Sequence, residues 1–491
     1  MKMASFVFFI LVLSGQVFAD GTPAEGAGTE NDPYQIETLD NLLWLSTTEA
    51  VWDSCYFLQT ADIDASDTES WNEGAGFSPI GLSNHNSFKG AYNGGDHIIY
   101  NLYINRPDDD FIGLFGSTDG AAFENLGIED VNIAGFHNTG SLVGCCVRSS
   151  IYACHANGNV TGDSWVGGLV GGLQVGTMFR SSYGSGSVTG NDQVGGLVGY
   201  TWLSTIRKSF ATCSVNGGNR AGGLLGSNNS STTISECYAT GNVTGYDDVG
   251  GLVGNNSTSN INDSYASGNV NGEYRVGGFV GGNYAAIIGE SYAAGLVTGE
   301  TEVGGLVGFN WVDQVENCIW NIEISGQING IGSNYGTEEN VLGMTTTEMQ
   351  MMSTYTDIYW DFWDESINGD EDIWGIDEDI NEGYPFIYDI EIPVNIDENA
   401  IHSGGQELRI ENYPNPFNPV TNICYEIGES GDVLVSIYNI KGQKVETLVN
   451  GYCEAGKHTI IWNAEEFGSG VYFIYFESGT TREVKKITLL K

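Results

Sequence analysis

One block of residues recurs through the middle of this chain at a nearly constant spacing. In its clearest copies it reads Val-Gly-Gly-Leu-Val-Gly, and its fourth position falls every 27 or 28 residues. That position holds Leu114, Leu142, Leu169, Leu197, Leu224, Leu252, Phe279 and Leu306. A unit of this length cannot bury its own apolar side chains, so the units must stack on one another.

A second block has the same period and contains an aromatic slot followed by a valine slot. The aromatic slot holds His155, Tyr183, Phe210, Tyr238, Tyr265 and Tyr292. The valine slot holds Val160, Val188, Val215, Val243, Val270 and Val297. We expect both slots to form ladders of packed side chains along the stack, and His155 to be a packed histidine rather than a catalytic one.

The composition of the repeat requires strands. Several glycines per block would each cost about 1 kcal/mol in a helix, and no 3.6-residue periodicity is present. Extended at roughly 3.3 Å per residue, one unit covers about 90 Å, enough for one turn of a three-sided coil. Propeller blades usually need about 40 residues. We therefore predict an all-β fold, a parallel β-helix (β-solenoid) whose glycines occupy corners and tight positions that need φ > 0.

The repeated Gly-Leu-x-Gly, as in Gly168-Leu169-Val170-Gly171, resembles the GLUG-motif proteins. The resemblance extends upstream through Asp32-Pro33-Tyr34-Gln35-Ile36 to Phe88-Lys89-Gly90-Ala91-Tyr92-Asn93-Gly94. It implies an extracellular repeat protein, found beside adhesins and surface peptidases, without chemistry of its own. We place a lead-in with the start of the solenoid at 20–110 and the repeats at 111–326.

The first residues read as a secretory signal. Lys2 precedes an apolar run from Phe6 to Leu13, and cleavage is expected between Ala19 and Asp20, so the signal peptide covers 1–19. No later segment is apolar for long enough to span a membrane. The formal charge of −46 repels phosphate backbones, which argues against nucleic acid as a partner.

Past the repeats, 327–400 is expected to be an acidic, tryptophan-containing cap. From Tyr355 to Ala400 it carries fifteen Asp or Glu and no Lys or Arg. Asp370-Glu371-Asp372 and Asp377-Glu378-Asp379-Ile380-Asn381 offer oxygen ligands for a structural calcium, but the spacing departs from an EF-hand loop, so a solvated acidic surface is favoured. Otherwise we expect no cofactor.

A linker at 401–410 leads to a segment of different composition, 411–491, which holds seven of the seventeen Lys and Arg. Alternating runs such as Val433 to Tyr438 predict a small Ig-like antiparallel β-sandwich. Tyr413-Pro414-Asn415-Pro416-Phe417-Asn418-Pro419 and Ser469-Gly470-Val471-Tyr472 resemble the C-terminal sorting domain of type IX secretion. The resemblance implies a diderm bacterium, contact with that secretion machinery, and a mature protein that is secreted or held at the outer cell surface. The alternative is an Ig-like domain that stays on the mature protein.

Cysteines give little sign of a disulfide framework. Cys154, Cys237 and Cys318 share one repeat position about three units apart, too far to pair, and are expected to be buried apolar residues. Cys424 and Cys453 are the plausible pair.

Positions that vary between similar repeats are the better candidates for function, because a solenoid binds ligands with columns of exposed side chains. We nominate Trp165, Arg220 and Arg275 from the column before the block, and Trp202, Tyr284 and Trp311 from the column after it. No histidine lies in a recognisable catalytic motif, and we assign no catalytic residue. The leading hypothesis is a non-catalytic adhesin that binds extracellular glycan or a host or matrix protein. A glycan-cleaving β-helix enzyme, a polysaccharide lyase or hydrolase, is the alternative.

Overall fold

A computed structural model gives the fold of the chain in two units, residues 1–391 and 392–491. In the first unit it describes 21–82, 86–312, 314–363, 373–377 and 380–387. In the second it describes 410–413, 419–427, 430–439, 444–454, 456–464, 467, 470–478 and 481–489. The expected signal peptide, with Ala19 and Asp20, and most of the expected linker lie outside the described residues.

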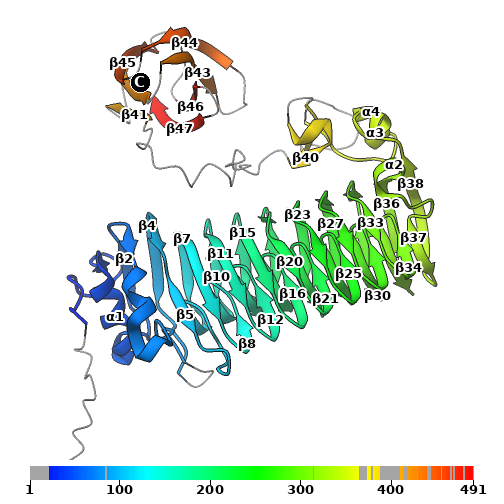
Figure 1. Ribbon diagram of the computed structural model, residues 1–491, viewed down its shortest axis with the longest axis horizontal. Helices are drawn as coiled ribbons and strands as arrows, with labels where there is room; N and C mark the ends of the chain where they lie inside the picture. The colour runs from blue at the N-terminus through cyan, green and yellow to red at the C-terminus, as the bar shows by residue number, and fades with distance from the viewer. Residues whose placement is uncertain are drawn as a thin grey trace, which may run out of the picture. The chain divides into compact units, whose positions relative to one another are not determined.

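The first unit is a stack of coils whose strands pair in parallel with the strands of the next coil (Figure 1). Three long sheets run along the stack, with 22, seven and nine strands, and we call them sheets I, II and III. Identical repeat positions face each other: Val166 pairs with Val194, and Val170 with Val198. The predicted all-β parallel solenoid of about 27-residue coils is therefore confirmed.

Sheet I contains β1 (Tyr34–Ile36), β2 (Tyr56–Gln59), β3 (Ile63–Asp64), β4 (Ala91–Tyr100), β5 (Tyr103–Asn105), β7 (Ala122–Ala134), β10 (Ser150–Tyr152), β11 (His155–Thr161), β14 (Met178–Arg180), β15 (Tyr183–Thr189), β18 (Thr205–Arg207), β19 (Phe210–Ala211), β20 (Ser214–Asn216), β23 (Thr233–Ala239), β24 (Val243–Thr244), β27 (Asn260–Ala266), β28 (Val270–Asn271), β31 (Ile287–Gly289), β32 (Tyr292–Ala293), β33 (Val297–Thr298), β36 (Gln314–Asn321) and β38 (Thr337–Met344).

Sheet II contains β8 (His137–Thr139), β12 (Ser164–Gly167), β16 (Asp192–Gly195), β21 (Asn219–Gly222), β25 (Asp247–Gly250), β29 (Tyr274–Gly277) and β34 (Thr301–Gly304). Sheet III contains β6 (Phe115–Asp119), β9 (Val143–Val147), β13 (Val170–Gln174), β17 (Val198–Trp202), β22 (Leu225–Asn229), β26 (Val253–Ser257), β30 (Val280–Tyr284), β35 (Val307–Trp311) and β37 (Ile331–Asn334).

The ends of the stack differ from its middle. Helix α1 (Leu39–Thr47) begins at a capping box between Thr38 and Asn41 and buries Leu42 and Leu45 in the main core beside the first coil. At the other end, β37 and β38 add one more coil beyond residue 326, where the sequence period is lost. The solenoid therefore continues to Met344.

The segment after β38 forms α3 (Thr346–Met349), α4 (Met352–Thr356) and a small antiparallel pair, β39 (Trp374–Gly375) with β40 (Phe386–Ile387). Another short helix, α2 (Ile322–Ser325), lies between β36 and β37. Trp360 and Trp374 are fully buried and share one hydrophobic cluster with Tyr265 and Tyr292 of the aromatic slot. These tryptophans thus cover the aromatic ladder, which is separate from the main core.

The glycines of the block serve a different purpose from the one expected. None of them has a positive φ; the left-handed residue is the non-glycine before each block, such as Trp165 with φ 57°. At Gly199 a Cβ would lie 2.5 Å from the backbone carbonyl carbon of Trp165 in the preceding coil. These glycines are needed because sheets II and III approach each other backbone to backbone. The expectation of tight positions is right, and that of φ > 0 is wrong.

The second unit is a sandwich of two antiparallel sheets, as predicted. One contains β41 (Ile410–Tyr413), β42 (Val420–Ile427) and β45 (Gly456–Asn463), and the other β43 (Gly431–Asn439), β44 (Lys444–Cys453), β46 (Gly470–Ser478) and β47 (Thr481–Leu489). Both sheets contribute to one core around Trp462. Cys453 is a free thiol, and the side chain of Cys424 lies outside the described residues, so the proposed pair is not formed here.

Cys154, Cys237 and Cys318 are buried free thiols, as expected. Burial raises the pKa of Cys154 and of Cys237 to about 12, so both stay protonated at neutral pH. Among the residues that the structure describes, no helix has the length and apolar character needed to cross a bilayer.

Candidate functional site

The outer face of sheet III carries two positions per coil whose side chains point away from the core. The inner position between them is filled by a buried ladder of amides, in which Asn228 Nδ2 donates to Asn256 Oδ1 and Asn256 Nδ2 to Asn283 Oδ1, each at 2.8 Å. This ladder satisfies the interior polar groups and holds the coils in register. The outer positions are therefore free to vary.

The second outer position is the column after the block that the sequence nominated. Strand pairing aligns Gln174, Trp202, Asn229, Ser257, Tyr284 and Trp311 in one row. The first outer position forms a parallel row of Gly172, Tyr200, Ser227, Asn255, Gly282 and Phe309. Sequence reasoning missed this row, although its variation from copy to copy was a usable signal.

Aromatic residues gather at the C-terminal end of this face, where Tyr284, Phe309, Trp311 and Tyr335 form what we call the aromatic cluster. The ring centroids of Phe309 and Tyr335 are 5.8 Å apart, and those of Trp311 and Tyr335 are 5.5 Å apart. Trp311 is 49% exposed and Tyr335 66% exposed. Large aromatic side chains with this much exposure in one cluster are typical of a recognition surface.

A smaller aromatic group lies further toward the N-terminus on the same face. The rings of Trp165 and Tyr200 stack with centroids 4.1 Å apart, and Trp202 beside them is 38% exposed. From Trp202 to Trp311 the row crosses four strand spacings, roughly 19 Å at about 4.8 Å each. The coils between them present Asn229, Asn255 and Ser257, whereas Ser227 is buried and hydrogen-bonded to Asn229 and Asn255.

An ionic cluster borders the aromatic cluster. Asp248 Oδ1, in β25, lies 2.6 Å from Arg275 Nε, and Arg275 also pairs with Asp247. Tyr284 donates its hydroxyl to Asp248 Oδ1 at 2.9 Å. Burial raises the pKa of Asp248, and Arg275 opposes this rise. The cluster holds the Tyr284 ring in place at the edge of the face.

The two predicted arginines lie beside the face in ion pairs. Arg220 makes a bidentate contact with Asp192, with Nε to Oδ1 at 2.9 Å and Nη2 to Oδ2 at 2.6 Å. Arg275 is paired as described above. The structure thus brings Trp165, Trp202, Tyr284 and Trp311 to one surface, with Arg220 and Arg275 along its border. Trp202 and Trp311 are exposed, and the other four are half-buried.

The aromatic slot on sheet I has a different environment. Successive rings from Tyr183 to Tyr292 stack with centroids 4.6 to 5.0 Å apart and interplanar angles of 5° or less. We call Tyr183, Phe210, Tyr238, Tyr265 and Tyr292 the aromatic stack; its last four members are almost fully buried. His155 stacks on Tyr183 at 4.8 Å, which fits the expected packed histidine.

A serine, a histidine and an aspartate that the sequence did not connect meet on sheet II. Ser164 Oγ lies 2.7 Å from His137 Nδ1, and Asp163 Oδ2 lies 3.8 Å from the same nitrogen. In a catalytic triad the serine and the aspartate contact opposite ring nitrogens. Here both groups approach the same nitrogen, so the arrangement is not that of a triad. Ser164 and His137 are one repeat period apart and meet because neighbouring coils stack.

The acidic stretches proposed for calcium fall largely outside the described residues: 370–372, 378 and 379 are not among them. Within the described part of the chain, no group of three or more His, Cys, Asp or Glu side chains is placed to hold a metal ion. The calcium hypothesis is therefore untested.

Comparisons with known proteins match two parts of the chain. The secretion system C-terminal sorting domain matches residues 411–490, and the GLUG motif matches residues 245–271. Halomucin of Haloquadratum walsbyi is 36% identical over 162 residues, 32% of this chain but 2% of halomucin. A protein of Evansella cellulosilytica, provisionally named a Gly-rich membrane protein, is 35% identical over 123 residues, 23% of this chain and 13% of that protein.

This chain therefore spans only a small part of the length of those curated relatives. Among solved structures, a Bacteroides ovatus protein provisionally named an immunoglobulin A1 protease aligns over 74% of this chain and 94% of its own, with 17% identity and a TM-score of 0.44. At that level the likeness carries no argument about activity. The sorting domain shows that the protein is exported through type IX secretion, to the outer surface or beyond it.

Proposed function

We propose that this GLUG-motif repeat protein, exported by means of its type IX sorting domain, is a non-catalytic surface adhesin that binds extracellular glycan through the outer face of sheet III. The observation that carries the proposal is the exposed aromatic cluster of Tyr284, Phe309, Trp311 and Tyr335. Aromatic faces stack on the apolar faces of sugar rings, and rigid rings lose little conformational entropy on binding.

The polar residues of the same face support a glycan as the ligand. Asn229 and Asn255 carry both donor and acceptor groups, and Ser257 carries a hydroxyl, so the middle of the face can exchange hydrogen bonds with sugar hydroxyls. The row from Trp202 to Trp311 runs along the solenoid axis. An extended chain lying along that axis would contact aromatic rings at both ends and amides between them.

Charge narrows the class of glycan. The chain carries 63 Asp and Glu against 17 Lys and Arg, and both arginines beside the face are paired with aspartates. A polyanionic glycan would be repelled by this field. We therefore expect a neutral polysaccharide.

The test is a glycan array probed with the exported chain, with release of reducing ends measured in parallel. Trp311→Ala should weaken binding about ten- to a hundredfold, as expected for an aromatic anchor. Tyr152→Ala is the matched control, since Tyr152 is 51% exposed but lies on sheet I. Equal binding by both variants would disprove the proposed face, and release of sugar products would disprove the non-catalytic role in favour of the glycan-cleaving alternative.

A further inference from the structure

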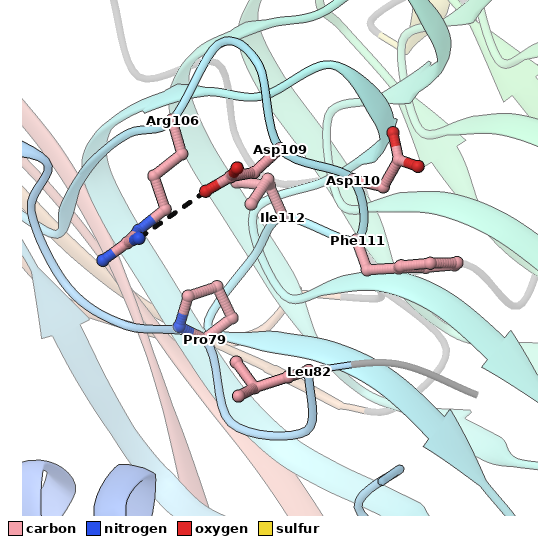
Figure 2. Close-up of a pocket in the computed structure, with 7 residues that line it drawn as sticks. All are labelled: Pro79, Leu82, Arg106, Asp109, Asp110, Phe111 and Ile112. Atoms are coloured by element: carbon pink, nitrogen blue, oxygen red, sulfur yellow. Dashed lines mark ion pairs between the residues drawn. The ribbon is translucent and has the colours of Figure 1, made fainter. Parts of the chain in front are cut away.

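A pocket of about 360 Å³ opens among the first coils, at a distance in sequence from the aromatic cluster (Figure 2). One wall comes from Pro79 and Leu82, in the chain between β3 and β4. The other comes from the loop between β5 and β6, which supplies Arg106, Asp109 and Phe111 among others. The pocket is near the small end of ligand sites, which run from about 300 Å³ upward, so it suits a single ring.

Arg106 is held rigidly at one side of the pocket. Its Nε donates to the Phe77 carbonyl at 3.3 Å and its Nη2 to Ser78 Oγ at 3.1 Å, and Nη1 lies 3.6 Å from Asp109 Oδ2. The side chain is 20% exposed. A guanidinium has five N–H donors, so two remain beyond these three contacts.

Two carboxylates, Asp109 and Asp110, line the pocket from the same loop as the arginine (Figure 2). Asp110 Oδ1 accepts the backbone N–H of His137 at 3.3 Å, which fixes its orientation, and Asp109 is 60% exposed. An ionised carboxylate has about four acceptor sites, and these contacts occupy few of them. The pocket therefore offers rigid donors and acceptors together.

Phe111 is the aromatic residue that lines the pocket, and its backbone is left-handed. Its φ is 61°, a conformation that bulky residues rarely adopt, and it is held there because its N–H donates to the His137 carbonyl at 2.9 Å. Ile112 pairs with Thr139, and Thr139 with Val166, so Phe111 takes the corner position of Trp165. The left-handed φ therefore belongs to the repeat position, as at Trp165 with φ 57°, and it fixes the place of Phe111 beside the pocket.

We propose that this pocket binds one ring of a neutral pyranose sugar, stacked against Phe111, Leu82 and Pro79 and hydrogen-bonded by Arg106, Asp109 and Asp110. Sugar hydroxyls both donate and accept, which matches the mixed polar side. Two carboxylates beside one arginine oppose a sugar acid, and the fixed arginine opposes a protonated amine. The site is independent of the aromatic cluster and does not rest on the proposed function.

The test uses the exported chain and saturation-transfer NMR with the methyl glycosides of glucose, galactose and mannose. At least one should bind the wild-type protein. Asp110→Asn keeps the acceptor for His137 N–H but removes the charge, and Phe111→Asn keeps a residue that tolerates the left-handed conformation but removes the ring. Each variant should raise Kd about tenfold or more, whereas Trp311→Ala should leave Kd unchanged.

Three outcomes would overturn the proposal. The first is that none of the three methyl glycosides gives a saturation-transfer signal with the wild-type protein. The second is unchanged binding in Asp110→Asn, a nearly isosteric change whose folding is verified by circular dichroism, so that a folding failure of Phe111→Asn does not decide the test. Stronger binding of Nα-acetyl-lysine methylamide than of any sugar is the third, and it would assign the pocket to a cationic side chain.

Discussion

The aromatic stack on sheet I and the aromatic cluster on sheet III belong to the same solenoid, but their surroundings are opposite. In the stack, rings lie nearly parallel at 4.6 to 5.0 Å, and Tyr265 is 2% exposed. In the cluster, rings meet at angles up to 48°, and Tyr335 is 66% exposed. Neighbouring aromatic rings on this solenoid can therefore be either buried parts of the fold or exposed parts of a surface.

What separates them is how the slot is filled from coil to coil. The stack position is aromatic in each coil from His155 to Tyr292, where each ring packs on the ring of the next coil. The position that holds Trp311 alternates between Gln, Trp, Asn, Ser and Tyr. A position that the fold does not constrain is available for a ligand.

The largest expected effect comes from breaking the stack. Tyr265→Ala removes a buried ring between Tyr238 and Tyr292 and leaves a cavity, so the free energy of unfolding should fall by about 3 to 5 kcal/mol. Trp311→Ala should change it by about 0.5 kcal/mol or less because the side chain is half exposed. Denaturant unfolding of both variants measures the difference, and equal losses would contradict the division of roles.

Hydroxyl groups within the stack sharpen the same comparison. Tyr292 donates to the Pro385 carbonyl at 2.7 Å and accepts from Asn381 Nδ2 at 2.8 Å, so Tyr292→Phe should cost about 1 kcal/mol. The buried Tyr238 hydroxyl has no hydrogen-bond partner within the described part of the chain. Tyr238→Phe should therefore stabilise the protein by about 1 kcal/mol. Thermal unfolding gives both signs, and a loss in both variants would show that Tyr238 has a partner.

The period and composition of the repeat were sufficient to predict the parallel solenoid and both ladders. They did not predict the conformation of the corners, because Trp165, Arg220 and Asp248 share no chemistry that favours φ > 0. There the ladder of hydrogen bonds imposes the left-handed backbone. The copy of the block around Leu114 is one residue shorter than the others, so that the sequence does not fix the place of Phe111, and the pairing of Ile112 with Thr139 puts it at the position of Trp165.

The sequence also indicated half of the candidate face. The column with Trp202, Tyr284 and Trp311 was found from its variation, whereas Tyr335 lies where the spacing falls from 27 to 24 residues, Val307 pairing with Ile331. The repeat period therefore could not predict the position of Tyr335. The ion pair of Arg220 with Asp192 could have been predicted from the sequence, because the two residues are 28 positions apart, which is one repeat.

Adding an aromatic residue to the exposed row of sheet III should strengthen glycan binding. Ser257 lies in the row between Asn229 and Tyr284, so Ser257→Trp would continue the aromatic surface toward Trp202. One added stacking contact of about 0.5 to 1.5 kcal/mol should raise the affinity for long neutral glycans two- to tenfold. Calorimetric titration measures it, with Ser257→Ala as the control. A fall in affinity would place the ligand off this row.

The smallest effect concerns the pH dependence of Asp248 at the edge of the face. Burial raises the pKa of Asp248 above its usual value, although Arg275 opposes the rise, so the stability that the protonated carboxyl contributes is lost as pH rises through the folded-state pKa. Asp248→Asn removes this titration and still accepts the Tyr284 hydroxyl, while Arg275 keeps Asp247.

Relative to the wild-type protein, Asp248→Asn should therefore gain stability between about pH 3 and pH 7. The difference in Tm between the two proteins across that range is the measurement, because the titration of all other groups cancels in it. A variant that instead loses stability as pH rises would mean that attraction to Arg275 outweighs burial, and that Asp248 is ionised at little cost. In that case the Tyr284 ring would be held by a charged acceptor, and Asp248→Asn should also weaken glycan binding.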